Sequence, residues 1–302
     1  MSAHAERRAG AALPSGAVSL MLLLCAIWGL NMVAVKTGNA GIPPVLQAGL
    51  RSVVSGALLL GWSALRGVDL RSWRHDGTLL WGVLAGAIFA LEFVALYIGI
   101  GWTTASRAII FLYGAPFFVA AGMHAFVPED RLTPAKLAGL ATAFGGLLLA
   151  FAEGLSGPEG WRALAGDALC LAGGAAWAAV TVIVKATPLR RAAPEVMLLY
   201  QLLVSAPLLL LAAPLFGPLA LAPTPLVIAA FIYQSVGIAF VSYTAWFWLV
   251  SRHSASRLSA FSFLTPIFGV LAGALLLGEP LGPLFAGGAV LVAAGLWLVN
   301  RP

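Results

Sequence analysis

Two ionisable residues, Arg51 and Glu92, lie deep inside long apolar stretches of this 302-residue sequence. A charged side chain is costly in hydrocarbon, so such a residue usually faces a partner or a water-filled cavity. Arg51 follows the start of its stretch by nine residues, and Glu92 precedes the end of the next stretch by eight. At 1.5 Å per helical residue, both side chains lie about 12 to 13 Å from the same membrane face.

Three roles for this pair are open at the level of sequence. Glu92 could bind a proton or an amine, with the Arg51 charge acting on its ionisation. The two could instead form a buried structural ion pair, or have no contact. Their counterparts in the repeat described below are Gln201 and Ser242, so the pair serves one half of the chain only.

Aromatic residues recur in the same apolar stretches. Each is more often a packing or interface residue than a ligand contact. As a group they would suit an apolar or aromatic side chain, or a cationic amine held against ring faces. The candidates are Trp28, Tyr97, Phe111, Tyr113, Trp177, Tyr243, Trp246 and Phe261.

Uncharged polar side chains provide a second set of candidates. Asn31 and Thr181, together with Gln47 and Gln234, could hydrogen-bond a zwitterion or could instead join helices to one another.

Two prolines, Pro116 and Pro266, fall in the middle of apolar stretches and at equivalent repeat positions. Each removes a backbone hydrogen bond and clashes with the carbonyl four residues earlier. In lipid, a freed carbonyl is tolerated only beside protein or water. We expect helix kinks that act as hinges or line a pathway, with a kink that only improves packing as the alternative.

Sequence motifs of enzymes are missing. The chain has no Gly-x-Ser-x-Gly, no His-Glu-x-x-His and no phosphate-binding loop, and its four histidines are scattered. We therefore expect no catalysis, no metal site and no cofactor. Without a nucleotide-binding motif, a gradient of substrate or protons must drive any transport.

The elements that position these residues are membrane-spanning helices. The chain is 61% hydrophobic and only 9% charged, against about 25% charged in ordinary soluble domains. A helix needs roughly 20 apolar residues to cross the hydrocarbon core. The sequence predicts an all-α polytopic membrane protein with ten such spans: Val18–Lys36, Ile42–Leu65, Thr78–Ile100, Thr103–Val127, Leu132–Ala152, Ala163–Ala186, Pro194–Phe216, Pro225–Val250, Ser254–Leu277 and Leu281–Asn300.

The sequence of the first half recurs in the second. Trp28 returns as Trp177 149 positions later, and Pro116 returns as Pro266 150 positions later. Each half holds five spans, an odd number, so the second copy enters the membrane from the opposite side. We expect a tail at 1–17, a first repeat at 18–152, an extracytoplasmic linker at 153–162 and a second repeat at 163–302.

Basic residues predict the orientation. With a cytoplasmic N-terminus, thirteen Lys and Arg fall on the inner side and three on the outer side, which is the bias that the positive-inside rule requires. Both termini are then cytoplasmic, and the net charge of +6 reflects topology and anionic lipid rather than nucleic acid.

The residues resemble those of the EamA family in the drug/metabolite transporter superfamily. The resemblance rests on Ala26–Asn31 with Lys36, on Pro43–Pro44, and on Leu264–Gly269 with Gly278–Pro280. It covers all but about the first fifteen residues and implies an exporter of amino acids or related metabolites. Two positions in the second half depart from the family pattern, Ala178 and Gln201.

We therefore expect an inverted-repeat transporter of the bacterial inner membrane that exports amino acids, with aromatic or hydrophobic side chains favoured, by alternating access. A multidrug or lipophilic-cation exporter is the alternative within transport. An intramembrane lipid-acting enzyme would need more polar groups than two deep charges, and a non-transporting scaffold is the third alternative. The expected partners are a small-molecule substrate and the bilayer, and a monomer suffices.

Overall fold

The computed structural model describes residues 13–71, 76–103, 105–152, 160–277 and 283–301. The expected tail and linker lie largely outside these residues. Within the described ranges the regular elements are all helical, which confirms the all-α prediction.

In the part of the chain that the structure describes, ten helical spans follow one another, and several consist of more than one segment. They are α2 (Ser15–Asn39), α3 (Pro44–Leu65), α4 (Leu79–Trp102), α5 (Ala105–Leu112) with α6 (Ala115–Phe126), α7 (Pro134–Ala150), α8 (Trp161–Ala186), α9 (Pro194–Ala212) with η4 (Ala213–Phe216), α10 (Pro225–Ile232) with η5 (Tyr233–Ser242) and α11 (Tyr243–Arg252), α12 (Ala255–Ala260) with η6 (Phe261–Phe263) and α13 (Leu264–Leu277), and α14 (Pro283–Asn300). The turn η3 (Pro188–Arg191) joins α8 to α9.

Length separates one helix from the rest. Among the described residues, nine spans are long and apolar enough to cross a membrane, and the tenth, α7, is apolar but has 17 residues. Seventeen residues extend about 26 Å, slightly less than the hydrocarbon core of about 30 Å. The predicted span over Leu132–Ala152 was therefore longer than the helix that forms.

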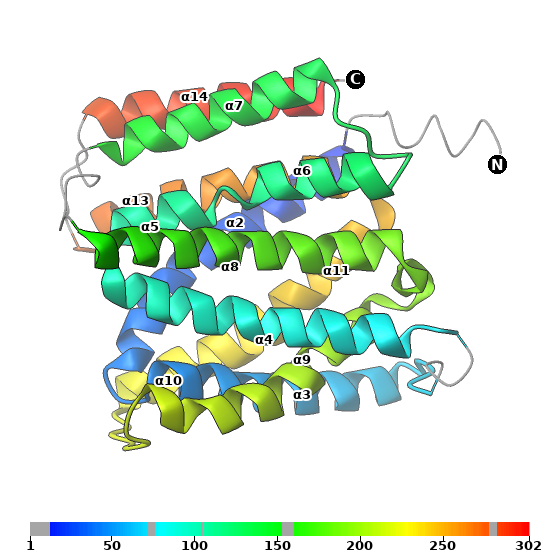
Figure 1. The fold of residues 1–302 in the computed structure, drawn as a ribbon, viewed down its shortest axis with the longest axis vertical. Coiled ribbons are helices and arrows are strands. Elements are labelled where there is room, and N and C mark those ends of the chain that lie inside the picture. Colours follow the sequence, from blue (N-terminus) through cyan, green and yellow to red (C-terminus); the bar gives the residue numbers. More distant parts are fainter. Residues whose placement is uncertain (1–12, 72–75, 104, 153–159, 278–282, 302) are drawn as a thin grey trace.

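Helix packing follows the relation between the two halves. The second helices, α3 and α9, pack together, and so do the fifth helices, α7 and α14, which lie side by side at one edge of the molecule (Figure 1). The first helix of each half packs on the third and fourth spans of the other: α8 on α4, α5 and α6, and α2 on α10, η5 and α13. Each half thus completes its core with the other, in the two-repeat architecture that the sequence predicts.

Glycines permit the closest of these approaches. A Cβ at Gly146 of α7 would lie 2.6 Å from the Gly288 carbonyl oxygen of α14, and one at Gly139 would lie 2.7 Å from the Gly295 carbonyl oxygen. The two pairs are related by the repeat, because Gly288 is the counterpart of Gly139 and Gly295 is the counterpart of Gly146. Small residues at such crossings let backbones pack closely where lipid provides no hydrophobic drive.

Candidate substrate site

Aromatic side chains from several spans meet in the interior. The indole of Trp246 on α11 lies between two tryptophans, with ring centroids 5.8 Å from Trp28 on α2 and 5.7 Å from Trp177 on α8. Trp28 also lies 6.5 Å from Tyr243, edge to face. The two repeat-related tryptophans, predicted from their spacing, are therefore joined through one residue of the second half.

The row of rings continues onto α4. Phe89 lies 6.3 Å from Tyr243 and 5.0 Å from Phe93, and Phe93 lies 6.4 Å from Tyr97. Offset and edge-to-face contacts at these distances stabilise aromatic groups. We call this set the aromatic cluster: Trp28, Phe89, Phe93, Tyr97, Trp177, Tyr243 and Trp246.

Phe89 and Phe93 were not among the site residues predicted from the sequence, although two patterns indicated them. Phe89, Phe93 and Tyr97 are four residues apart, so they occupy one face of a helix. Phe93 also stands 150 positions before Tyr243, which makes the two repeat counterparts.

Arg51 lies against the aromatic cluster. Its guanidinium carbon is 4.3 Å from the centroid of the Phe93 ring, and the side chain is almost completely buried on α3. The Arg51 charge also acts on Glu92, Tyr97 and Tyr243, which places these side chains in one neighbourhood. No nitrogen–oxygen distance of 4.0 Å or less joins Arg51 to Glu92, so the two do not form the close ion pair that was one of the three alternatives.

Several buried polar atoms near the aromatic cluster have no hydrogen-bond partner in the protein. They are Nε and Nη2 of Arg51, Oε2 of Glu92 and Nε1 of Trp246; Oδ1 of Asn31, three residues after Trp28 on α2, is also without a partner. A buried donor or acceptor without a partner costs about 1 to 3 kcal/mol, and more when it is charged. Buried polar atoms without a partner also occur elsewhere in the described residues, for example at Ser63 and Asn300. Here they adjoin the aromatic cluster and include atoms of Arg51 and Glu92, which makes this region the candidate ligand site.

Backbone irregularities surround the same region. The eighth span contains the ten-residue π-helix η5, a rare form that occurs frequently at functional sites. The hydroxyl of Ser242, its last residue, accepts the Trp28 Nε1–H at 2.9 Å. Tyr233, its first residue, donates from its hydroxyl to the Ile27 carbonyl at 2.8 Å.

The two spans that contain Pro116 and Pro266 are each interrupted just before that proline. Tyr113 and Gly114 separate α5 from α6, and Pro116 lies in the first turn of α6. In the other half the 3₁₀ turn η6 precedes α13, whose third residue is Pro266. These interruptions recur between the halves, as the prolines do.

Other residues of the predicted site make hydrogen bonds or packing contacts within the protein. Thr181 donates to the carbonyl of Trp177 in its own helix at 3.1 Å, and Gln47 donates to Gln234 at 2.9 Å, which joins α3 to η5. Phe261 is buried in η6, where its carbonyl accepts from the Cys25 thiol at 3.2 Å. Tyr113 packs against the same hydrophobic core as Trp28, Trp177 and Tyr243, and it interacts electrostatically with Tyr243. No ring contact between described residues joins Tyr113 or Phe261 to the aromatic cluster.

Comparison with known proteins identifies the chain. The profile of the EamA-like transporter family matches it twice, over residues 15–152 and 164–301. The chain belongs to this family. The double match repeats the division into halves, and it confirms the resemblance drawn from the sequence.

Relatives of this EamA transporter include named efflux proteins. The probable amino-acid metabolite efflux pump of Salmonella typhimurium is 31% identical over 92% of this chain and 93% of its own length. The protein of the same name in Escherichia coli is 30% identical, with coverage of 92% and 93%. A solved crystal structure shares the fold, with a TM-score of 0.76 at 20% identity over 95% of this chain and 96% of that one. The family and these relatives are transporters, so the chain is a multi-pass membrane transporter and not an enzyme.

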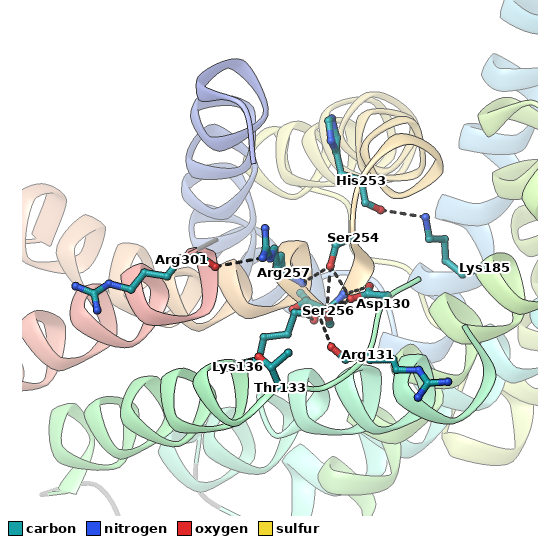
Figure 2. A network of polar contacts seen from close by, with 11 residues as sticks. Asp130, Arg131, Thr133, Lys136, Lys185, His253, Ser254, Ser256, Arg257 and Arg301 are labelled. Carbon is teal, nitrogen blue, oxygen red and sulfur yellow. Dashed lines mark hydrogen bonds and ion pairs between the residues drawn. The ribbon is translucent and has the colours of Figure 1, made fainter. Parts of the chain in front are cut away.

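A polar network ties the two halves of the EamA transporter at one end (Figure 2). The carboxylate of Asp130 accepts from Lys136 Nζ at 2.7 Å, from Ser254 Oγ at 2.8 Å, from Ser256 N at 3.0 Å and from the Ser256 hydroxyl. Burial alone would raise the pKa of Asp130, but the Lys136 charge and these hydrogen bonds hold it below the ordinary value.

A cavity of about 420 Å³ opens beside this network. Its lining includes Asp130 and His253, together with the basic residues Lys185, Arg190 and Arg252. Lys185 donates to the His253 carbonyl at 3.0 Å. Burial and the neighbouring Lys185 and Arg252 charges lower the pKa of His253, which favours the neutral imidazole.

A second tie joins the halves near the opposite ends of the helices. Arg107 of α5 forms an ion pair with Asp167 of α8, and Thr103 donates to the same carboxylate at 2.6 Å. The segment from Thr103 to Arg107 is the repeat counterpart of the segment from His253 to Arg257. Equivalent segments therefore tie the halves at both ends.

Proposed function

We propose that this EamA transporter exports amino acids with aromatic or hydrophobic side chains across the bacterial plasma membrane. The observation that carries the proposal is the aromatic cluster, which receives a tryptophan from each half and has unpartnered charged atoms beside it. Ring faces contribute apolar area for a hydrophobic side chain. The charged atoms supply contacts for a zwitterionic backbone. The name of the two bacterial relatives, probable amino-acid metabolite efflux pump, supports amino acids as the substrate, without a preference among them.

Alternating access is the mechanism we propose. Inverted repeats can exchange their two packings, which opens a shared central site to each face in turn. The ties at Asp130 and at Arg107–Asp167 join the halves at opposite ends. In an outward-facing state the Arg107–Asp167 tie opens, and in an inward-facing state the Asp130 network opens. The interrupted spans at Pro116 and Pro266 are the proposed hinges.

The orientation belongs to the proposal as well. With thirteen basic residues on one side and three on the other, the Asp130 end and its cavity face the cytoplasm and both termini lie inside. The cavity is then the cytoplasmic entrance. The protein requires no cofactor, and a solute or proton gradient drives the cycle.

A lipophilic-cation exporter is the second candidate. It is favoured by one observation, the Glu92 carboxylate oxygen that lacks a partner near aromatic rings. A quaternary or protonated amine would bind there through cation–π contacts and a charge pair. The two candidates differ in whether the ligand needs a carboxylate.

A thermal-shift screen of the purified transporter tests the proposal. A ligand that binds only the folded state stabilises it by about 2.7 kcal/mol at a concentration of 100 times Kd. We expect tryptophan, phenylalanine and leucine to raise Tm, and polyamines and tetraphenylphosphonium to leave it unchanged. Counterflow of the stabilising amino acid in proteoliposomes then measures transport. Stabilisation by tetraphenylphosphonium alone would replace the amino-acid proposal with the cation exporter.

A further inference from the structure

The guanidinium of Arg51 has an unsatisfied hydrogen-bonding edge. The side chain is 2% exposed, the Tyr243 hydroxyl lies within reach of the guanidinium, and the Nε and Nη2 atoms have no hydrogen-bond partner in the protein. These two nitrogens lie on the same edge of the guanidinium plane, and their N–H bonds point in the same direction. Two parallel donors of this kind match the two oxygens of a carboxylate.

The contact with Phe93 leaves this edge available. The guanidinium carbon lies 4.3 Å from the ring centroid, and a cation over a ring face is held without use of its N–H groups. A carboxylate could thus approach Arg51 while the stacking persists. Arginine suits this role better than lysine because its fork is planar and rigid.

Two other basic side chains in the interior, Lys136 and Lys185, differ from Arg51. Lys136 pairs with Asp130, and the half-buried Lys185 donates to the Val250 carbonyl at 2.8 Å. These cations are bonded to protein oxygens. Burial by itself therefore does not explain the unpartnered edge of Arg51.

Repeat symmetry gives an internal comparison. The counterpart of Arg51 in the second half is Gln201, equally buried, whose amide donates to the Met197 carbonyl at 3.0 Å. The counterpart of Glu92 is Ser242, which is bonded to Trp28. The same fold position is satisfied internally in one half and unsatisfied in the other, so the fold does not require the charge.

We propose that Arg51 binds the carboxylate of the transported solute, so that the substrates are carboxylates held by their acid group against the aromatic cluster. This proposal deepens the proposed function and rests on it for the location of the site. The solute's side chain contacts the rings, and an amino group, where the solute has one, is within the field of Glu92. Lipophilic cations without an acid group are then poor ligands.

Matched ligands test this assignment on the purified full-length transporter. The probes are phenylalanine, phenethylamine (which lacks the carboxylate) and 3-phenylpropionate (which lacks the amine), with leucine and isoamylamine as a non-aromatic pair. Dissociation constants are measured by calorimetry for the wild type, Arg51→Gln, Arg51→Lys and Arg66→Gln. Arg66 is an exposed residue at the end of the same helix, so Arg66→Gln is the control for the substitution itself.

We expect the wild type and Arg66→Gln to bind each carboxylate more tightly than its decarboxylated partner. Arg51→Gln should weaken carboxylate binding by about 10- to 100-fold, the range for a hydrogen bond to a charged group. It should leave phenethylamine and isoamylamine unchanged. Arg51→Lys should recover only part of the loss, because it keeps the charge without the fork.

Stability gives a readout that needs no ligand. A structural role for the Arg51 charge predicts a lower Tm for Arg51→Gln without ligand, whereas a ligand-binding role predicts an unchanged or higher Tm because a buried charge is removed. A lower Tm, or the same carboxylate preference in Arg51→Gln as in the wild type, would overturn the assignment.

The proposed function can fail separately. If leucine and 3-phenylpropionate bind through Arg51 but aromatic amino acids do not, the aromatic substrate class is wrong and the Arg51 assignment stands. If only the amines bind the wild type, the assignment is wrong and the cation exporter is favoured. If no probe binds the wild type, both proposals are rejected.

Discussion

Replacing Glu92 by glutamine separates a functional carboxylate from a structural one. The amide keeps the size of the side chain and removes its charge. If Glu92 and Arg51 formed a buried ion pair, the loss of one partner would cost about 3 to 5 kcal/mol. The structure has no approach of 4.0 Å or less between them. Beyond 4 Å, two unit charges attract by less than about 4 kcal/mol at an effective dielectric constant of about 20.

The desolvation that the Glu92 charge suffers offsets much of that attraction, because one of its oxygens is buried without a hydrogen bond. We therefore expect Glu92→Gln to change the free energy of unfolding by no more than about 1 kcal/mol, a shift in Tm of about 2 to 4 °C. Transport should nevertheless be lost, because the amide cannot bind a proton or pair with an amine.

Thermal unfolding in detergent measures the first quantity, and amino-acid counterflow in proteoliposomes measures the second. Glu195→Gln is the matched control, since Glu195 lies in the first turn of α9, away from the aromatic cluster. The decisive variant is Arg51→Met with Glu92→Gln. A large loss of stability in Glu92→Gln, with stability and transport both restored in the double variant, would refute the reasoning and make Glu92 structural.

Three further results are expected. In a cysteine-free background, Leu219→Cys between α9 and α10 should react with an impermeant thiol reagent from outside and Asp69→Cys should not; the reverse would invert the topology and contradict export. Trp28→Cys and Trp177→Cys should react with small thiol reagents, and transported solute should slow both reactions; reaction rates that no transported solute alters would remove the aromatic cluster from the pathway. The pKa of Asp130 is lowered in the folded state, so the ionised carboxylate stabilises the fold fully above the ordinary pKa of 3.8, and this stabilisation is lost as the pH falls through the lower folded value. Asp130→Asn should abolish the fall in Tm that accompanies this loss. An unchanged pH profile of Tm in Asp130→Asn would assign the fall to other carboxylates.

The spans and the repeat were predictable because lipid imposes a strict length and polarity on each helix. The backbone conformation inside each span was less predictable. Hydropathy is blind to the hydrogen-bond pattern of the backbone, so the π-helix η5 inside the predicted span Pro225–Val250 could not be seen. A proline predicts that a helix is disturbed nearby. The carbonyl that Pro116 disturbs is the one four residues earlier, and α5 ends at that residue, Leu112.

The candidate site was likewise predictable only in part. Repeat spacing singled out Trp28 and Trp177, and the structure brings both to Trp246. The relation between Arg51 and Glu92 was not predictable, because counting residues gives the depth of a side chain but not the direction in which its helix faces. Side chains at equal depth can point toward or past each other. The rotation of a helix is fixed by packing, here by crossings such as that of α3 with α9.

The two halves are equivalent in fold but not in chemistry, and the difference bears on what the site can bind. Trp28 and Trp177 are symmetric, as are Phe93 and Tyr243, so the apolar part of the aromatic cluster receives rings from both halves. The charged part comes from the first half alone. A fully symmetric site would bind an elongated solute equally well in either direction. Charges on one side fix the solute's direction, while the symmetric helices around it remain able to exchange their packings. A symmetric frame for movement and an asymmetric site for recognition are compatible with an amino acid, which has a polar end and an apolar end.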